Sequence, residues 1–173
     1  MVKRSLPAIR ILTAAWLCLG LVSCKGGPPK EPAEGTRVVH DKSDFSLISP
    51  SDWQITSSTR GFSLVRKTPY GGGFPTLTLR RITEAEAKVL NVSGQKTERE
   101  EGTFVYRYQR WRNTRGQGYR LEVLYQTGAG LLFADASVWD PSPQLNKRFF
   151  EDQFWPILNS LQEDSSTSLE KLP

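Results

Sequence analysis

The stretches TFVYRYQRWR at residues 103–112 and YRLEVLYQ at residues 119–126 carry the clearest structural signal in the chain, because both are rich in aromatic and β-branched residues that favour strands. A short segment with two glycines, Gly116 and Gly118, separates them. Two such runs joined by a glycine-containing connection predict a long antiparallel hairpin. A β-sheet is therefore expected at the centre of the fold.

Shorter runs of alternating apolar and polar residues continue this pattern on both sides of the hairpin. Turn-forming residues such as Pro50 and Gly128 separate them. Each run predicts a half-buried strand, and the runs lie at residues 45–48, 53–56, 62–66, 76–81 and 131–139. Together with the hairpin they predict an antiparallel sheet of about six or seven strands.

Two helices are expected beside this sheet. The sequence Thr83-Glu84-Ala85-Glu86 has the spacing of a capping box and predicts a helix that runs to about Val92. Ser142 and Pro143 are typical of the start of a second helix, in which Pro156 should cause a kink or a restart. Its apolar residues, spaced mostly three and four apart, would pack on the sheet: Leu145, Phe149, Phe150, Phe154, Ile157, Leu158 and Leu161. An antiparallel sheet flanked by helices is an α+β fold.

Two motifs at the ends of this region resemble those of PsbP-like domains. The stretch FSLISPSDW at residues 45–53 is similar to the family's opening F-S-x-x-x-P-x-x-W pattern, and residues 154–161 are similar to its closing helix. The resemblance implies an antiparallel sheet flanked by helices, in a PsbP-like sandwich. The family includes photosystem extrinsic subunits and bacterial envelope lipoproteins, so the resemblance implies a binding or accessory scaffold rather than a reaction.

The N-terminus has the organisation of an export signal. Three basic residues precede an apolar run at residues 11–21 that is too short to span a membrane. The sequence Leu21-Val22-Ser23-Cys24 resembles the lipobox of bacterial lipoproteins. The resemblance implies that residues 1–23 are a signal peptide and that the thiol of Cys24 takes a diacylglyceryl group. An ordinary secretory signal with a chance cysteine is the alternative.

Lipidation at Cys24 would hold the mature chain stably at a membrane, because two or more acyl chains bind a bilayer far more strongly than one. The next residue is Lys25 rather than the aspartate that often signals inner-membrane retention. We therefore expect a lipid-anchored protein of the cell envelope, on the periplasmic side of the outer membrane if the host has two membranes. The membrane is its first expected partner.

Removal of residues 1–23 would leave 150 of the 173 residues, which suits one domain. We predict a Pro- and Gly-rich tether at residues 24–36, a PsbP-like domain at residues 37–162 and a flexible tail at residues 163–173. Three of the 23 basic residues lie in the signal, so 20 would remain against 18 acidic ones and the net charge would fall from +5 to +2. Export and this near balance disfavour nucleic acid as a partner.

The sequence contains no recognisable catalytic, metal or cofactor motif. His40 is the single histidine, which excludes a multi-histidine metal site, and it is expected at the surface or at a strand edge. A Gly-x-Ser-x-Gly elbow does not occur, and the glycines at residues 71–73 lack the Lys-Ser/Thr of a phosphate loop. We therefore expect no enzyme activity, no metal and no cofactor.

Arginines and aromatic residues are concentrated in the predicted hairpin. One interpretation is a binding patch for an anion or a partner protein, formed by Arg107, Arg110, Trp111, Arg112, Arg115 and Arg120. The other, which we favour, is the outer face of a sheet on which Arg107 or Arg120 pairs with Glu122 while the aromatic residues belong to the core. Strand alternation would place the odd-numbered and even-numbered residues of the first strand on opposite faces.

The sequence thus predicts a membrane-anchored, non-catalytic binding or accessory module of the cell envelope. Its partner would be an envelope protein or an anionic group of the cell wall or of a lipid. An enzyme with an unrecognised Ser, Asp or His site and a purely structural envelope protein are the two alternatives.

Overall fold

The computed structural model describes residues 31–40, 42–99, 102–113, 116–139 and 143–163, and these are mostly β, with 58% in strands and 18% in helices. The strands are β1 (Thr36–His40), β2 (Phe45–Ser49), β3 (Trp53–Ser57), β4 (Gly61–Arg66), β5 (Thr76–Ile82), β6 (Gln95–Arg99), β7 (Gly102–Asn113), β8 (Gly116–Thr127), β9 (Gly130–Val138) and β10 (Gln162–Glu163). The helical elements are α1 (Glu84–Leu90), α2 (Pro143–Phe149), the π-turn η1 (Phe150–Phe154) and α3 (Trp155–Asn159). The last three follow one another without a break and are called the C-terminal helical segment.

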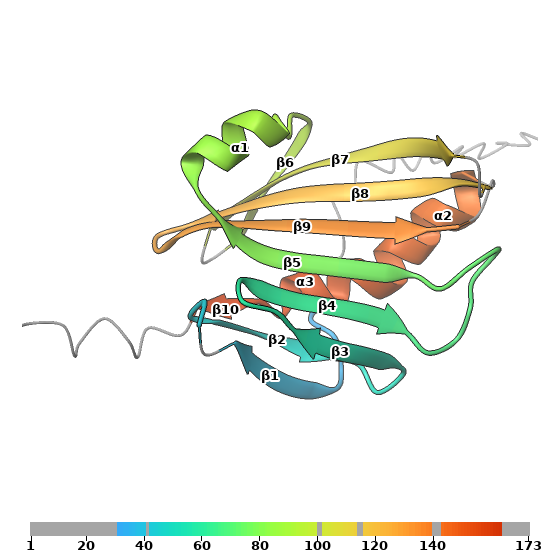
Figure 1. Ribbon diagram of the computed structural model, residues 1–173, viewed down its shortest axis with the longest axis horizontal. Coiled ribbons are helices and arrows are strands. Elements are labelled where there is room, and N and C mark those ends of the chain that lie inside the picture. Colours follow the sequence, from blue (N-terminus) through green and yellow to red (C-terminus); the bar gives the residue numbers. More distant parts are fainter. Residues whose placement is uncertain (1–30, 41, 100–101, 114–115, 140–142, 164–173) are drawn as a thin grey trace, which may run out of the picture.

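The described strands form two antiparallel sheets (Figure 1). The larger sheet has seven strands in the order β3-β4-β5-β9-β8-β7-β6, and the smaller has three in the order β1-β2-β10. The predicted hairpin is confirmed, since β7 and β8 pair along their whole length, from Gly102 opposite Thr127 to Asn113 opposite Gly116. The five shorter strands predicted from the sequence are β2, β3, β4, β5 and β9.

The predicted α+β class, with a sheet of about six or seven strands flanked by helices, is wrong. The C-terminal helical segment covers one face of the large sheet, called the inner face, while α1 lies on the other, outer face and contains no buried residue. A second sheet completes the cover of the core, because Phe45 and Leu47 of β2 are fully buried. The fold is therefore β-rich, with two sheets and two helical segments among the described residues.

The two predicted helices are present where the sequence placed them. The capping box of α1 is confirmed: the Glu86 N–H donates to the Thr83 hydroxyl at 3.2 Å, and the Thr83 N–H donates to the Glu86 carboxylate at 2.8 Å. The helix ends at Asn91, which adopts a left-handed conformation with φ of 44°. The interruption expected at Pro156 takes the form of η1, and the predicted N-cap Ser142 lies outside the described residues.

The core lies between the inner face, the small sheet and the C-terminal helical segment. Trp155 is fully buried, and its indole N–H donates to the Tyr108 hydroxyl at 2.9 Å. Burial raises the pKa of the Tyr108 phenol to about 12. Six of the seven residues in the predicted apolar stripe are buried, and the exception is Leu145, which is 55% exposed.

The end of the predicted tether is bound to the fold. Ala33 is buried, and its N–H donates to the Pro156 carbonyl at 2.8 Å. The side-chain amide of Asn159 donates to the Glu31 carbonyl at 3.3 Å. The tether predicted for residues 24–36 is therefore docked on α3 at its C-terminal end. Among the described residues, no helix is long and apolar enough to cross a membrane.

Candidate functional site

A row of ion pairs crosses the outer face of the large sheet. The Arg107 guanidinium on β7 donates to Glu122 on β8 at 2.5 Å. Arg120, also on β8, lies 3.4 Å from Glu122 and donates to Asp135 on β9. The hydrogen bond to Asp135 raises the pKa of Arg120. These pairs confirm the interpretation of Arg107 and Arg120 as outer-face residues of a sheet.

The six residues of the predicted arginine–aromatic patch do not form one surface. Trp111 packs edge-on against Trp139, with ring centroids 4.5 Å apart. Arg110 and Arg112 are exposed, and because they alternate with Trp111 along β7 they lie on the opposite side of the strand. Arg115 lies outside the described residues. The structure therefore brings together Arg107 and Arg120, through Glu122, with Trp111 on the same side of β7 as Arg107, and places Arg110 and Arg112 on the opposite side.

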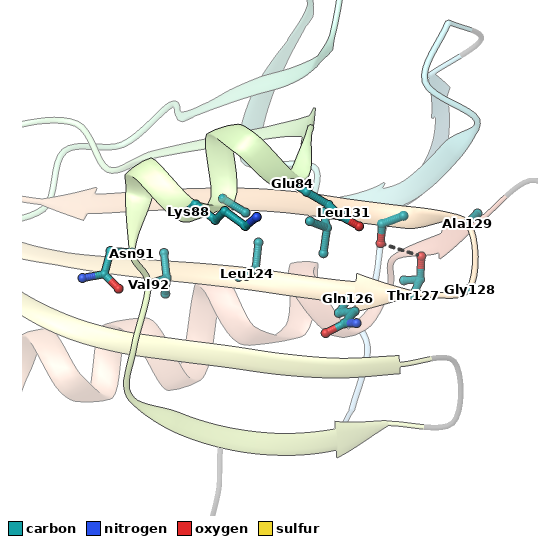
Figure 2. Close-up of a pocket in the computed structure, with 12 residues that line it drawn as sticks. Glu84, Lys88, Asn91, Val92, Leu124, Gln126, Thr127, Gly128, Ala129 and Leu131 are labelled. Carbon is teal, nitrogen blue, oxygen red and sulfur yellow. Dashed lines mark hydrogen bonds between the residues drawn. The ribbon is translucent and has the colours of Figure 1, made fainter.

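The structure forms a pocket between α1 and the turn from β8 to β9, which no feature of the sequence had indicated. This α1 pocket has a volume of about 640 Å³. Its floor contains Leu124 and Leu131, and Lys88 of α1 lies above Leu124 (Figure 2). The other lining residues form the rims: Glu84, Ala87, Asn91 and Val92 on the α1 side, and Gln126, Thr127, Gly128, Ala129 and Gly130 on the hairpin side. An apolar floor with a polar rim is typical of binding sites.

Helix α1 is held at its two ends by arginines from the large sheet and its turns. The Glu86 carboxylate accepts from Arg60 at 2.6 Å and from Arg80 at 3.2 Å. The hydrogen bond from Arg60 is the main cause that lowers the pKa of the Glu86 carboxyl far below its usual range. At the other end, Arg107 donates to two carbonyls of the last turn of α1, at 3.0 and 3.4 Å. Attachment at the ends leaves space below the middle of the helix.

The opposite wall of the α1 pocket is also held in place. Glu163 on β10 accepts hydrogen bonds from the Thr127 hydroxyl and, at 3.3 Å, from the Ala129 N–H. Arg81 donates to the Ala129 carbonyl at 3.1 Å and lies 3.5 Å from Glu163. Glu163 was predicted to begin the flexible tail, but it belongs to a strand and supports the pocket. No local motif could reveal this pocket, since its two walls come from segments that meet only in the folded chain.

His40 was expected at the surface or at a strand edge, but its side chain is buried in the core. It ends β1, but its side chain is only 4% exposed, between the rings of Phe45 and Phe62. Its Nε2 is 2.8 Å from the Ser58 carbonyl, which can only accept, so Nε2 carries the proton. The described residues contain no cluster of three His, Cys, Asp or Glu that could hold a metal ion. Cys24 lies outside the described residues.

No protein-family model matches this chain, and no curated protein matches it. Among solved structures, it is similar to a protein from Bacteroides thetaiotaomicron, with a TM-score of 0.49 and 14% sequence identity. The match covers 76% of this chain and 49% of that chain, so this chain spans about half the length of its structural neighbour. The resemblances to a lipobox and to PsbP-like sequences stay predictions.

Proposed function

We propose that the protein is a membrane-anchored, non-catalytic binding module of the cell envelope that holds a partner in the α1 pocket. The observation that carries this proposal is the position of α1, which buries none of its residues and is nevertheless fixed at both ends by arginines. The helix contributes no fully buried residue to the core, and it forms one wall of a pocket whose other wall is also fixed. Walls held in place before binding reduce the entropy that binding costs.

The lining of the pocket suits a partner with an apolar group beside a charged or polar one. Leu124 and Leu131 can cover an aliphatic or aromatic side group. Lys88 on the rim can pair with an anion, and the amides of Asn91 and Gln126 can donate and accept hydrogen bonds. An apolar and acidic segment of an envelope protein fits these properties.

The lipobox-like sequence that ends at Cys24 supports the location at a membrane. Because Glu31 and Ala33 are bound to α3, only the six residues from Lys25 to Lys30 remain to separate the lipid from the domain. At about 3.1 Å per residue these can extend by roughly 19 Å, about half of the reach of a twelve-residue tether. The domain would stay close to the membrane surface.

Site-specific photocrosslinking tests the proposed binding site. A photoreactive amino acid at Gln126, on the pocket rim, should capture a discrete partner in native membranes, and Lys88→Glu should reduce its yield. The same photoreactive residue at Arg148, whose side chain is 81% exposed on α2, is the control and should not capture that partner. Identical products from both positions, or a yield unaffected by Lys88→Glu, would contradict the proposal.

A further inference from the structure

Strand β6 ends the large sheet on one side, because no described strand lies beyond it. It pairs with β7 through one of its edges. Its other edge pairs with no described strand, and such an edge offers backbone N–H and C=O groups to a further strand, although the Glu98 carbonyl already accepts a hydrogen bond from the Arg99 guanidinium at 3.2 Å. The other end of the large sheet differs, since β3 lies beside the small sheet (Figure 1) and His40 of β1 is hydrogen-bonded to Ser58, just after β3.

The charges on β6 are complementary to those of a second β6 in antiparallel orientation. Its sequence is Gln95-Lys96-Thr97-Glu98-Arg99, and both Lys96 and Glu98 are exposed. If two copies pair antiparallel about Thr97, Lys96 of each copy lies opposite Glu98 of the other. The joint would then contain two cross-strand pairs of opposite charge, an arrangement that stabilises strand pairing.

We propose that the protein forms a homodimer in which β6 pairs with β6 of a second copy, antiparallel and centred on Thr97. Charges on an edge strand usually prevent pairing, and here they prevent the competing arrangements. Parallel pairing in register would place Lys96 opposite Lys96, and antiparallel pairing centred on Lys96 or on Glu98 would place like charges opposite each other. The pattern therefore selects one register by attraction and disfavours the others by repulsion.

The twofold axis of this dimer is perpendicular to the joined sheet, so the outer faces of both copies lie on one side. Both α1 pockets then face the same way, and both Ala33–Pro156 contacts lie on the inner side with the C-terminal helical segments. Two lipid anchors could thus enter one membrane. This statement about the anchors rests on the proposed function, but the proposed strand pairing does not.

A five-residue joint is small beside a standard interface of about 1,600 Å². We expect weak association in solution and stronger association where two chains share a membrane.

Disulfide trapping in the full-length chain tests the register. Thr97 would oppose Thr97 of the second copy with Cα atoms about 4.5–5.5 Å apart, within the range for a disulfide. Thr97→Cys should therefore give a covalent dimer under mild oxidation, above any dimer that the parent chain gives under the same conditions. Gln95→Cys is the control, because the two copies of that position would lie roughly 14 Å apart along the strands. Equal dimer yields from the two variants would overturn the proposal.

Charge reversal tests the same joint independently. Lys96→Glu in the Thr97→Cys chain should weaken association by about tenfold or more, since both opposite-charge pairs become like-charge pairs. Adding Glu98→Lys should restore the dimer yield, because the charges are complementary again. Lys42→Glu makes the same change of charge at an exposed residue outside the large sheet and should have no effect. A double variant whose dimer yield stays as low as that of Lys96→Glu would also overturn the proposal.

The two proposals can fail separately. A chain that dimerises but gives no crosslinked partner from Gln126 would contradict the proposed function alone.

Discussion

Single side chains hold the parts of this molecule in place, and Glu86 is the clearest example. It caps α1 and accepts hydrogen bonds from Arg60 and Arg80. Its folded-state pKa is lowered below the unfolded value of about 4.3. The stabilisation that Glu86 provides is therefore complete above that value and is lost as the pH falls through the folded-state pKa.

We predict that the free energy of unfolding depends less on pH in Glu86→Gln than in the wild type. The free energy of unfolding of the wild type should fall more than that of the variant between about pH 7 and about pH 2, because the Glu86 carboxylate takes up a proton in the unfolded chain at a higher pH than in the folded chain, and the glutamine of the variant does not titrate. Urea denaturation at several pH values measures the difference. Glu84→Gln, which removes a carboxylate from the same helical turn, is the control and should behave like the wild type.

The hydrogen bond between Trp155 and Tyr108 leads to a second prediction about a single side chain. Tyr108→Phe removes the acceptor of a fully buried indole N–H and should lower the free energy of unfolding by about 1–3 kcal/mol. Chemical denaturation followed by tryptophan fluorescence measures it. Tyr119→Phe removes a hydroxyl from the same hairpin without affecting this bond, and an equal loss there would contradict the assigned role of Tyr108.

Alternation predicted which side chains of the hairpin share a face, but not all of their partners. The pairing of Arg107 with Glu122 followed from two strands that are neighbours in sequence. Asp135, the stronger partner of Arg120, lies on β9, and its side chain could be assigned only once β8 was known to lie between β7 and β9. Contacts between strands that are neighbours in the sequence were therefore predictable, and contacts that depend on the order of strands in the sheet were not.

At the scale of elements, close strand pairing in the large sheet depends on small residues. A Cβ atom on Gly118 would lie 1.9 Å from the Val138 carbonyl of the neighbouring strand, whereas one on Gly128 would have nothing within 4 Å. Gly118→Ala should force β8 and β9 apart and lower the free energy of unfolding by about 2 kcal/mol or more. Gly128→Ala is the matched control and should change it by about 0.5 kcal/mol or less. Thermal or urea unfolding of the two variants gives the comparison.

The strands that the sequence did not predict, β1, β6 and β10, have little apolar patterning. Strands β1 and β6 are mostly polar and exposed, and β10 has only two residues. Their backbones pair with β2 and β7, so their conformation depends on neighbours rather than on their own side chains. By contrast, α1 was predictable because its capping box is a local signal.

At the scale of the whole molecule, the fold class was not predictable from the elements that the sequence revealed. One helix with a clear apolar stripe and one with a capping box indicated an α+β protein, but the second packs on the outer face without burying a residue. Strands β1 and β10, which were not predicted, pair with β2 on either side and form a second sheet. This sheet covers part of the core that helices were expected to cover. The α1 pocket depends on the same long-range arrangement.

The proposed role requires a membrane anchor, and the mass of the N-terminal peptide of the mature protein tests this most directly. The chain should be isolated from the membrane fraction of its native host and digested, and its first peptide analysed by mass spectrometry. We predict a peptide that begins at Cys24 and carries a diacylglyceryl thioether, with or without an amide-linked acyl chain. A first peptide that begins at Met1, or one in which Cys24 bears no lipid, would contradict the account.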